Sequence, residues 1–468
     1  MKKVIFFSLL LSGIISCNSD DDGDYEVVVS ENITTPYLGG ETTIFDSSEN
    51  AYGFQAPNLD SESAFFFFTG NSLFNQSWVT APASTTAVDG LGPLFNARAC
   101  SGCHFKDGRG RPQEFTGEIS AGLLFRLSVP GVDEYGRNLP DPNYGGQLQD
   151  FAIGGVDAEG TININYSPIE VVYPDGTKVE LQDPNYSFTD LKYGEMSPEL
   201  QVSPRVANQM VGLGLLDAIE DETIVNYADE FDSNNDGISG KPNYVYDVAS
   251  NSKVLGRFGW KSNQPSLRQQ VAGAFLGDLG ITSSLFPDEN CPTGIDCDQM
   301  VNGNGDGDYE LTDSNLDLVT LYSATLAVPG KRNNFDEDVL EGESLFEKVN
   351  CIACHIPNIT TGSYSIAAME NQDIHPFTDL LLHDMGDGLA DNTPDFDANG
   401  NEWRTAPLWG IGLIETVNGH TRLLHDGRAR NVEEAILWHG GEAEASKLAF
   451  MDLNVEERTK VIGFINSL

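Results

Sequence analysis

The sequence predicts a mainly α-helical protein built from two related domains, with a β-containing insertion in the first half. Three observations support this fold class. The pentapeptide Cys-x-x-Cys-His occurs twice, at 100–104 and 351–355, so the chain resembles a diverged repeat. Most of the candidate elements have helical patterns. Residues 162–181 instead alternate in the manner of a β-hairpin.

Both pentapeptides match the attachment signature of c-type haem. In such a site the two thiols bond to the haem vinyl groups and the neighbouring His binds the iron. A zinc ribbon would place its Cys pairs about 15–20 residues apart, and a redox dithiol needs no His. Two covalent haem c groups are therefore expected. The predicted attachment residues are Cys100, Cys103, Cys351 and Cys354, and the predicted iron ligands are His104 and His355.

The N-terminus has the pattern of a signal peptide over residues 1–16. Two lysines precede an apolar run that is too short to cross a bilayer as a stable helix. The run ends in Ile14-Ile15-Ser16-Cys17, which resembles a bacterial lipobox. We expect cleavage before Cys17 and a lipid on its thiol; an ordinary secretory signal is the alternative. Residues 17–50 are polar and acidic and are predicted to be a tether.

These features predict a lipoprotein of the bacterial cell envelope, periplasmic or at the outer membrane, that meets the membrane through its lipid only. The remaining cysteines, Cys291 and Cys297, would close a short loop by a disulfide in an oxidising compartment. The formal net charge is -45, which argues against nucleic-acid binding. It favours basic partners with salt-sensitive attraction, although most of the acidic surface serves solubility.

The first haem domain is expected over residues 51–335. It opens near Phe74 and Trp78 and leads into the first pentapeptide. Residues 171–173 face 178–181 across a Pro-Asp-Gly-Thr turn, which predicts the hairpin. A haem domain of this kind needs only about 100 residues, so the hairpin belongs to an insertion.

Three helices are predicted after the hairpin. Ser203 is a favourable N-cap with Pro204 at the first helical position, so we expect a helix over 206–218. The other two are predicted over 265–279 and 313–325. The second haem domain is expected over 336–468. There a Gly-x-x-Leu-Phe helix at 342–346 runs into the second pentapeptide and resembles the first helix of small cytochromes c.

The supply of further iron ligands differs between the two haems. No His lies between His104 and His355, whereas five follow His355. The first haem is therefore expected to be open or weakly ligated, because Met196 and Met210 are more typical of core positions. An iron with two protein ligands mainly transfers electrons, while an open iron can bind peroxide or oxygen.

Three segments of the second half form a recognisable set of motifs. They are Trp403-Arg404-Thr405-Ala406-Pro407-Leu408-Trp409-Gly410, Leu424-His425-Asp426-Gly427-Arg428 and Val432-Glu433-Glu434-Ala435. These segments resemble the C-terminal half of bacterial dihaem cytochrome c peroxidases. More closely, residues 55–468 resemble their relatives, the dihaem oxidoreductase family with its peroxidase-like and thiol-oxidoreductase-like members.

The resemblance implies roles for several His residues. His439 stands where the peroxidases have the Met ligand of their C-terminal haem, so the second haem would have His355 and His439 as ligands. This exchange should lower its reduction potential, because thioether sulfur favours reduced iron. His425 would lie near a haem propionate. His383 would line the second haem, with a structural role as the alternative.

The resemblance also implies catalytic residues near the first haem. Trp260 would relay electrons between the haems, and Gln270 would be a polar group over the first iron. Gly280 stands where the peroxidases have their catalytic Glu, so Asp278, or a Glu such as Glu195, would move protons instead. The peroxidases' distal-loop His has no counterpart. These departures argue against classical peroxidase activity.

Three loops have ligand patterns of calcium sites. Asp232, Asn234 and Asp236 with Gly237 match the start of a calcium loop, but Asn243 replaces its final Glu. Looser matches occur at 302–313 and 395–400. Ordinary Asx and Gly turns are the alternative. The peroxidases' structural calcium adds to the case for at least one calcium ion.

The sequence thus predicts a haem enzyme, a peroxidase-like dihaem oxidoreductase. Its open first haem would receive electrons from a bis-His second haem. Its partners would be an electron-donor protein or small redox carrier, and peroxide or another small oxidant. Two alternatives stay open. One is a non-catalytic periplasmic electron-transfer cytochrome, and the other is an oxidase of thiols or protein side chains.

Overall fold

Helices account for 28% of the described residues and strands for about 20%, so the prediction of a mainly α-helical fold is wrong. The computed structural model describes residues 35–115, 118, 122–291, 294–295, 303 and 309–468. Within this part of the chain the strands form seven sheets of two or three strands each. With 48 Gly and 22 Pro, the sequence is interrupted too often for helices to dominate.

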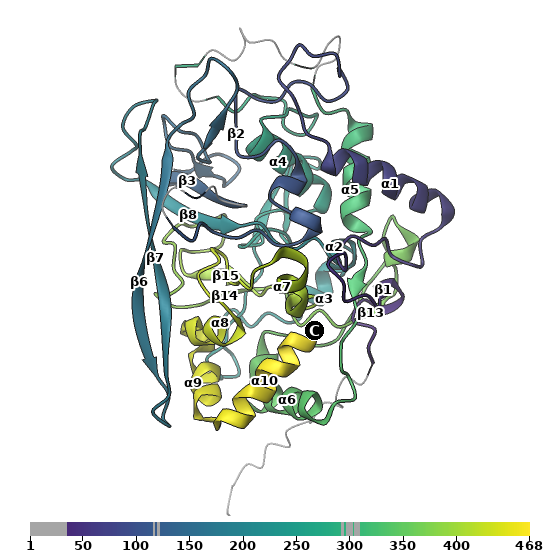
Figure 1. Cartoon of the computed structure of the whole chain (residues 1–468), viewed down its shortest axis with the longest axis vertical. Coiled ribbons are helices and arrows are strands. Elements are labelled where there is room, and N and C mark those ends of the chain that lie inside the picture. Colours follow the sequence, from purple (N-terminus) through teal and green to yellow (C-terminus); the bar gives the residue numbers. More distant parts are fainter. Residues whose placement is uncertain (1–34, 116–117, 119–121, 292–293, 296–302, 304–308) are drawn as a thin grey trace, which may run out of the picture. The chain divides into compact units, whose positions relative to one another are not determined.

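Residues 33–468 form one compact unit, shown in Figure 1. Its helices are α1 (Ser61–Asn75), α2 (Leu213–Asp217), α3 (Asp221–Val225), α4 (Leu267–Leu279), α5 (Asp313–Ala324), α6 (Glu337–Lys348), α7 (Ile414–Asn418), α8 (Val432–Trp438), α9 (Glu444–Asp452) and α10 (Val455–Ser467). Its strands are β1 (Thr43–Ile44), β2 (Leu94–Phe95), β3 (Leu123–Val132), β4 (Asn138–Leu139), β5 (Phe151–Ala152), β6 (Thr161–Val172), β7 (Lys178–Thr189), β8 (Gln201–Val206), β9 (Tyr244–Asp247), β10 (Ser252–Leu255), β11 (Val328–Pro329), β12 (Ile359–Thr360), β13 (Asp373–Ile374), β14 (Leu382–Asp384) and β15 (Glu402–Arg404).

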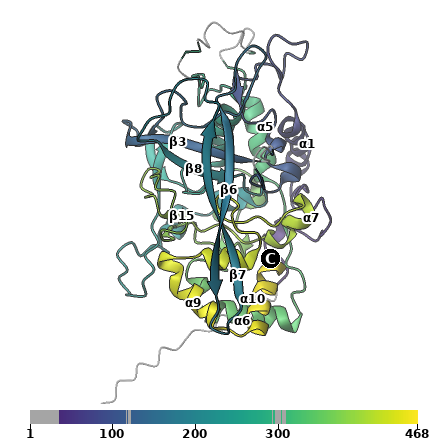
Figure 2. The same ribbon diagram turned by 60° about the vertical axis from the view of Figure 1, so that its left-hand side comes forward.

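The predicted β-hairpin is present as β6 and β7, paired antiparallel along their whole length. Figures 1 and 2 show it reaching from β3 and β8 to the C-terminal helices. At its turn, the Tyr173 hydroxyl donates to Glu433 Oε1 of α8 at 2.8 Å. Arg458 of α10 pairs with Asp175 at 2.6 Å. The insertion in the first half is thus attached to the second half.

The prediction of a helix over 206–218 is wrong for most of that range. Ser203 and Pro204 lie inside β8, which pairs with β3, and only α2 is helical. The Ser203 hydroxyl donates to Asp391 at 2.5 Å instead of capping a helix. Proline is tolerated because β8 is an edge strand of the sheet β4-β3-β8. Tertiary pairing therefore overrides the local capping signal.

The other two predicted helices are present as α4 and α5. Ser266 caps α4 by accepting from the Gln269 amide at 3.3 Å, and Thr312 caps α5 by accepting from the Asn315 amide at 3.3 Å. Both helices pack together, and α5 also packs against α1. Most buried apolar side chains of the described residues form one core that includes residues of both halves. Among these residues, none of the helices has both the length and the apolar character to span a bilayer.

The predicted Gly-x-x-Leu-Phe helix is α6, which packs closely against α10. A Cβ atom on Gly342 would come within 2.1 Å of the Lys460 carbonyl oxygen and 3.0 Å of Phe464 Cβ. Glycine at this position therefore allows the two backbones to approach. This contact supports Phe346 of α6, whose ring lies 6.2 Å from that of His355.

Substituting Gly342 with Ala should lower the free energy of unfolding by about 1–3 kcal/mol, because the two helices must separate. Gly463 of α10 is the matched control, since a Cβ there would contact nothing within 4 Å. Gly463→Ala should leave stability unchanged or raise it by up to about 1 kcal/mol. Denaturant unfolding of both variants measures the difference, and equal effects would contradict the packing argument.

Candidate haem site

All residues predicted to bind haem line one cavity of about 390 Å³. The wall includes both pentapeptides, so the two halves of the chain share a single internal site. It also includes the three predicted catalytic residues. The predicted site residues in the wall are Cys100, Cys103, His104, Trp260, Gln270, Asp278, Cys351, Cys354, His355, His425 and His439.

The first pentapeptide is a tight turn that presents its side chains to the cavity. Residues Cys100–Gly102 form one turn of 3₁₀ helix, and the His104 amide donates to the Cys100 carbonyl at 3.0 Å. His104 Nδ1 lies 2.7 Å from the Asn208 carbonyl oxygen. Phe74 of α1 packs near the imidazole, with 6.3 Å between ring centres. These contacts leave Nε2 of His104 available to a ligand.

The second pentapeptide repeats this geometry. Asn350, with φ of 62°, ends α6 and starts the 3₁₀ turn Cys351–Ala353. The His355 amide donates to the Cys351 carbonyl at 3.0 Å. His355 Nδ1 lies 2.9 Å from the Phe377 carbonyl oxygen. The two sites therefore hold their imidazoles in the same way, through the same ring nitrogen.

The thiols do not have the properties of a redox dithiol. All four are unpaired. Desolvation raises the pKa of the Cys100 thiol to about 12, and the same cause raises that of Cys351 to about 12. A reactive dithiol requires a lowered thiol pKa. The raised pKa values therefore argue against a redox dithiol at either pentapeptide.

His439 follows α8 and faces the same cavity. Its Nδ1 lies 2.7 Å from the Ala435 carbonyl oxygen, so Nε2 is again the available nitrogen. Desolvation lowers the pKa of His355 to about 4, and His439 is among the groups that lower it further. Both imidazoles line the same cavity.

This donor set fits haem. A histidine ligand of a metal typically donates its other ring N–H to a carbonyl, which fixes the tautomer and the ring orientation. His104, His355 and His439 all have that arrangement. Two free thiols accompany His104 and two accompany His355. The residues present therefore suit two haem groups in one cavity.

The three predicted catalytic residues lie on two neighbouring segments. Trp260 Nε1 donates to the Val206 carbonyl at 2.8 Å. Gln270 and Asp278 lie on α4, two turns apart, with Ala274 between them in the cavity wall. Asp278 Oδ1 accepts from Gln147 Nε2 at 2.8 Å. The polar groups of α4 thus face the cavity that also holds the first pentapeptide.

The resemblance places an acidic residue at position 280. An acidic side chain cannot replace Gly280 unless the surrounding backbone rearranges. It ends α4 with φ of 66°. A Cβ there would lie 2.7 Å from Gly92 Cα. The nearest acid with a place in the cavity wall is Asp278.

Residues 33–468 match the family model “Di-haem oxidoreductase, putative peroxidase”. The chain belongs to this family. The predicted resemblance is confirmed, and membership makes the protein a haem oxidoreductase with two haem groups. A search of curated proteins finds no match.

The dihaem site contains an aromatic stack to which the sequence assigned no role. Trp403 and His425 have ring centres 3.8 Å apart and planes 11° apart. The family motifs named both residues, but nothing in the sequence indicated that they touch. His425 Nε2 is buried without a hydrogen-bond partner. In the cavity wall it can therefore bind a polar group of the haem.

His383, which was expected to line the second haem, lies in the cavity wall and is held between two carboxylates. His383 Nε2 lies 2.8 Å from Asp379, and its Nδ1 lies 2.7 Å from Glu442. Cys354 Sγ lies 3.6 Å from Nδ1. Burial opposes the charged form, but Asp379 and the hydrogen bonds to Cys354 and Glu442 raise the pKa of His383 well above its ordinary value. An imidazolium thus borders the second pentapeptide.

Several predicted residues lie elsewhere. Asn234 and Asp236 are exposed, and the Asp232 carboxylate accepts from the Gly237 amide at 3.2 Å. Glu195 is exposed, and Met196 packs in a separate apolar cluster. Residues outside the described part of the chain include Cys17 and Cys297. Cys291 is disulfide-bonded, and its pairing with Cys297 stays a prediction.

The His383 cluster makes stability depend on pH. Because the folded-state pKa lies above the unfolded value of about 6.5, its contribution is complete below pH 6.5 and is lost as pH rises through the folded value. His383→Gln should lower the free energy of unfolding at pH 6 by roughly 3 kcal/mol. The same substitution should also remove the decline in the free energy of unfolding above pH 6.5.

The control is His420→Gln, because desolvation lowers the pKa of His420 to about 4. This variant should keep the decline of the wild type above pH 6.5. Denaturant unfolding across pH 6–9 measures both slopes. If the free energy of unfolding of His383→Gln falls with pH as steeply as that of the wild type, His383 is not charged in the folded protein.

Proposed function

We propose that the protein is a peroxidase-type dihaem oxidoreductase whose two haems are bound covalently through the Cys-x-x-Cys-His pentapeptides. The observation that carries this proposal is that both pentapeptides and three carbonyl-anchored imidazoles line one cavity. When bound, the haem irons supply the redox chemistry, with peroxide as the oxidant and an electron donor as the partner. The other steps are assigned to side chains of the cavity wall.

His355 and His439 are the two ligands of the second haem in this proposal. Their Nδ1 atoms are held by the Phe377 and Ala435 carbonyls, which leaves both Nε2 atoms to bind iron. Desolvation lowers the pKa of both residues, so each stays neutral, as an iron ligand must be. Two nitrogen donors favour electron transfer over substrate binding.

His104 is the only protein ligand of the first haem in this proposal. Met210 belongs to the segment that supports His104. The carbonyl of Asn208, two residues earlier, accepts from His104 Nδ1, and the Met210 amide donates to the Asp107 carbonyl. Met196 packs away from the cavity. The opposite face of the site is then left to α4, with Gln270 as the polar group there.

Trp260 and Asp278 have separate roles in turnover. Trp260 belongs to the wall shared by both pentapeptides and relays electrons between the two haem sites. Asp278 has Oδ1 bound by Gln147, which orients the carboxylate and leaves Oδ2 to accept and return a proton. Oriented in this way, Asp278 takes the part of the acid that Gly280 cannot supply.

Three further assignments complete the proposal. Attachment to the cell envelope through lipid on Cys17 would place the protein where covalent haem and a disulfide at Cys291 are compatible. The formal charge of -45 would favour a basic electron donor. Calcium at Asp232, Asn234 and Asp236 rests on the sequence pattern alone, because the bond from the Ile238 amide to Asp236 at 2.8 Å belongs to an ordinary Asx turn.

His439→Ala tests the ligand assignment. The oxidised wild type should show one low-spin and one high-spin haem, and the variant should lose the low-spin signal because one nitrogen donor is removed. Paramagnetic resonance and optical spectra of the haem-loaded protein measure this. His375→Ala is the control, because His375 bonds to the Pro357 carbonyl outside the cavity wall. Two low-spin haems in the wild type, unchanged on partial reduction, would indicate an electron carrier instead.

Asp278→Asn tests the proton-transfer role. Peroxide turnover with a reduced donor should fall by about 100-fold or more, the usual contribution of a general acid–base residue. Asp150→Asn is the control, since Asp150 belongs to the same polar cluster through Asn96 but not to the cavity wall. Wild-type turnover in Asp278→Asn would exclude this residue as the acid.

A further inference from the structure

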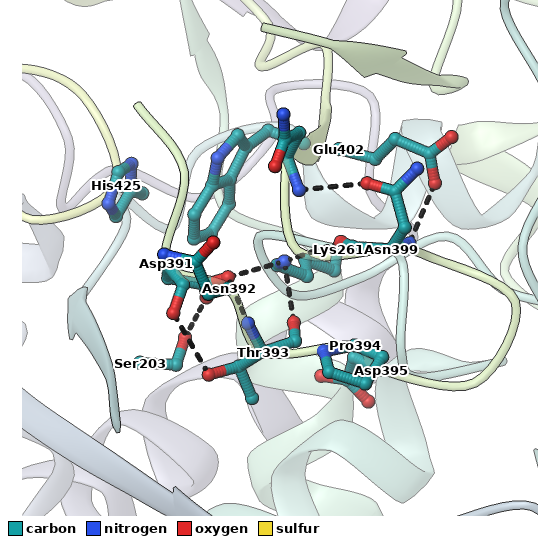
Figure 3. A network of polar contacts seen from close by, with 12 residues as sticks. Ser203, Lys261, Asp391, Asn392, Thr393, Pro394, Asp395, Asn399, Glu402 and His425 are labelled. Atoms are coloured by element: carbon teal, nitrogen blue, oxygen red, sulfur yellow. Dashed lines mark hydrogen bonds and ion pairs between the residues drawn. The ribbon is translucent and has the colours of Figure 1, made fainter. Parts of the chain in front are cut away.

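Lys261, the neighbour of Trp260, has a fully buried ammonium group. Its Nζ donates to Asp391 Oδ1 at 2.8 Å, to the Thr393 carbonyl at 2.8 Å and to the Asn399 carbonyl at 2.9 Å. Figure 3 shows these oxygen atoms converging on Nζ. An ammonium group has three N–H donors, so every donor has an acceptor.

The oxygen cage belongs to the second half of the chain, whereas the lysine belongs to the first. The other oxygen of Asp391 accepts from the Ser203 hydroxyl of β8 at 2.5 Å. Asp395 pairs with Arg205 of β8 at 2.9 Å. Asn243 Nδ2 donates to the carbonyls of Lys261 at 2.6 Å and of Asp395 at 3.0 Å. The loop at 391–399 is therefore attached to the first half through buried polar contacts.

The same ammonium group connects this loop to the cavity wall. Nζ lies 4.4 Å from the ring centre of Trp403, and Trp403 stacks on His425. The backbone next to Lys261 is held as well, because the Arg404 amide donates to the Trp260 carbonyl at 2.9 Å. Loss of the ammonium group would therefore affect the positions of Trp260, Trp403 and His425 together.

A carboxylate and two main-chain carbonyls are ligands that a hard metal cation takes in proteins. The sequence predicted a loose calcium pattern at 395–400, but the Asn399 carbonyl binds the ammonium group and Asp395 pairs with Arg205. We propose that Lys261 is a positioning residue whose ammonium group takes the place of a bound metal cation. It joins the two halves and holds the wall formed by Trp260, Trp403 and His425.

The expectation that Lys261 affects electron transfer between the haems rests on the proposed function. Its role in place of a metal cation does not. Removing the ammonium group leaves the Asp391 carboxylate, which is 1% exposed, without its counter-charge. A small side chain at 261 would also leave room in the cage for a free cation. The role of the charge can therefore be tested apart from turnover.

The test compares haem-loaded wild type with Lys261→Ala and Lys331→Ala. Lys331 is the matched control, because it is also buried, pairs with Glu343 at 2.8 Å and lies 5.0 Å from the Phe464 ring centre, outside the cavity wall. Both variants should lower the thermal unfolding midpoint by roughly 5–10 °C. Any calcium at Asp232, Asn234 and Asp236 stabilises all three proteins alike, so the test is the extra response of Lys261→Ala. Calcium chloride, against chelator at equal ionic strength, should raise its midpoint more than that of wild type or Lys331→Ala, by at least half of the loss. Equal responses to calcium in all three proteins would overturn the proposal.

A second variant keeps the proposal testable if Lys261→Ala does not fold. Lys261→Met preserves side-chain volume, and electron transfer from the second to the first haem after partial reduction should slow by roughly tenfold. Lys331→Met should keep the wild-type rate. If calcium rescues the Ala variant while the Met variant keeps the wild-type rate, the cation role stands and the positioning role of Lys261 is overturned. Failure of both Lys261 variants to accumulate, beside normal Lys331 variants, would indicate a folding role and overturn positioning.

Discussion

The rest of this structure depends on the anchoring of each imidazole through Nδ1 to a backbone carbonyl in the wall of one cavity. His104, His355 and His439 all obey this constraint. The carbonyl partner of His104 is 104 residues away in sequence, that of His355 is 22 residues away, and that of His439 is four residues earlier, in α8. A carbonyl acceptor fixes which ring nitrogen is free, and so it leaves Nε2 available to a ligand. The elements around the cavity must therefore place three carbonyls as accurately as the histidines themselves.

Buried charge joins the two halves around that cavity. Across the two halves, Lys261 is neutralised by Asp391 and Arg205 by Asp395. Within the second half, Asp379 and Glu442 pair with His383. Buried pairs of this kind add little net stability compared with apolar packing, but they are costly to break singly. They therefore select one relative placement of the paired segments. In a dihaem oxidoreductase this matters, because the residues that line a shared haem cavity need fixed positions.

Local signals in the sequence predicted the local structure well. The capping residues and spacing of α4 and α5 and the Pro-Asp-Gly-Thr turn of the hairpin are contained within short segments, and the structure agrees with them. The signal at Ser203 and Pro204 failed because β3 pairs with this segment from a distant part of the chain. The fold class failed for the same reason. Pairings such as β1 with β11 join residues that are far apart in sequence.

By itself, the sequence determined the chemistry of this protein, because Cys-x-x-Cys-His carries its thiols and its ligand within five residues and the family motifs are equally local. It therefore predicted two haem groups and the candidate residues around them. Only the tertiary structure decided that both pentapeptides share one cavity, that Trp403 lies against His425, and that an ammonium group fills the cage at 391–399. These features depend on contacts between residues far apart in the chain, whose distances no local pattern encodes.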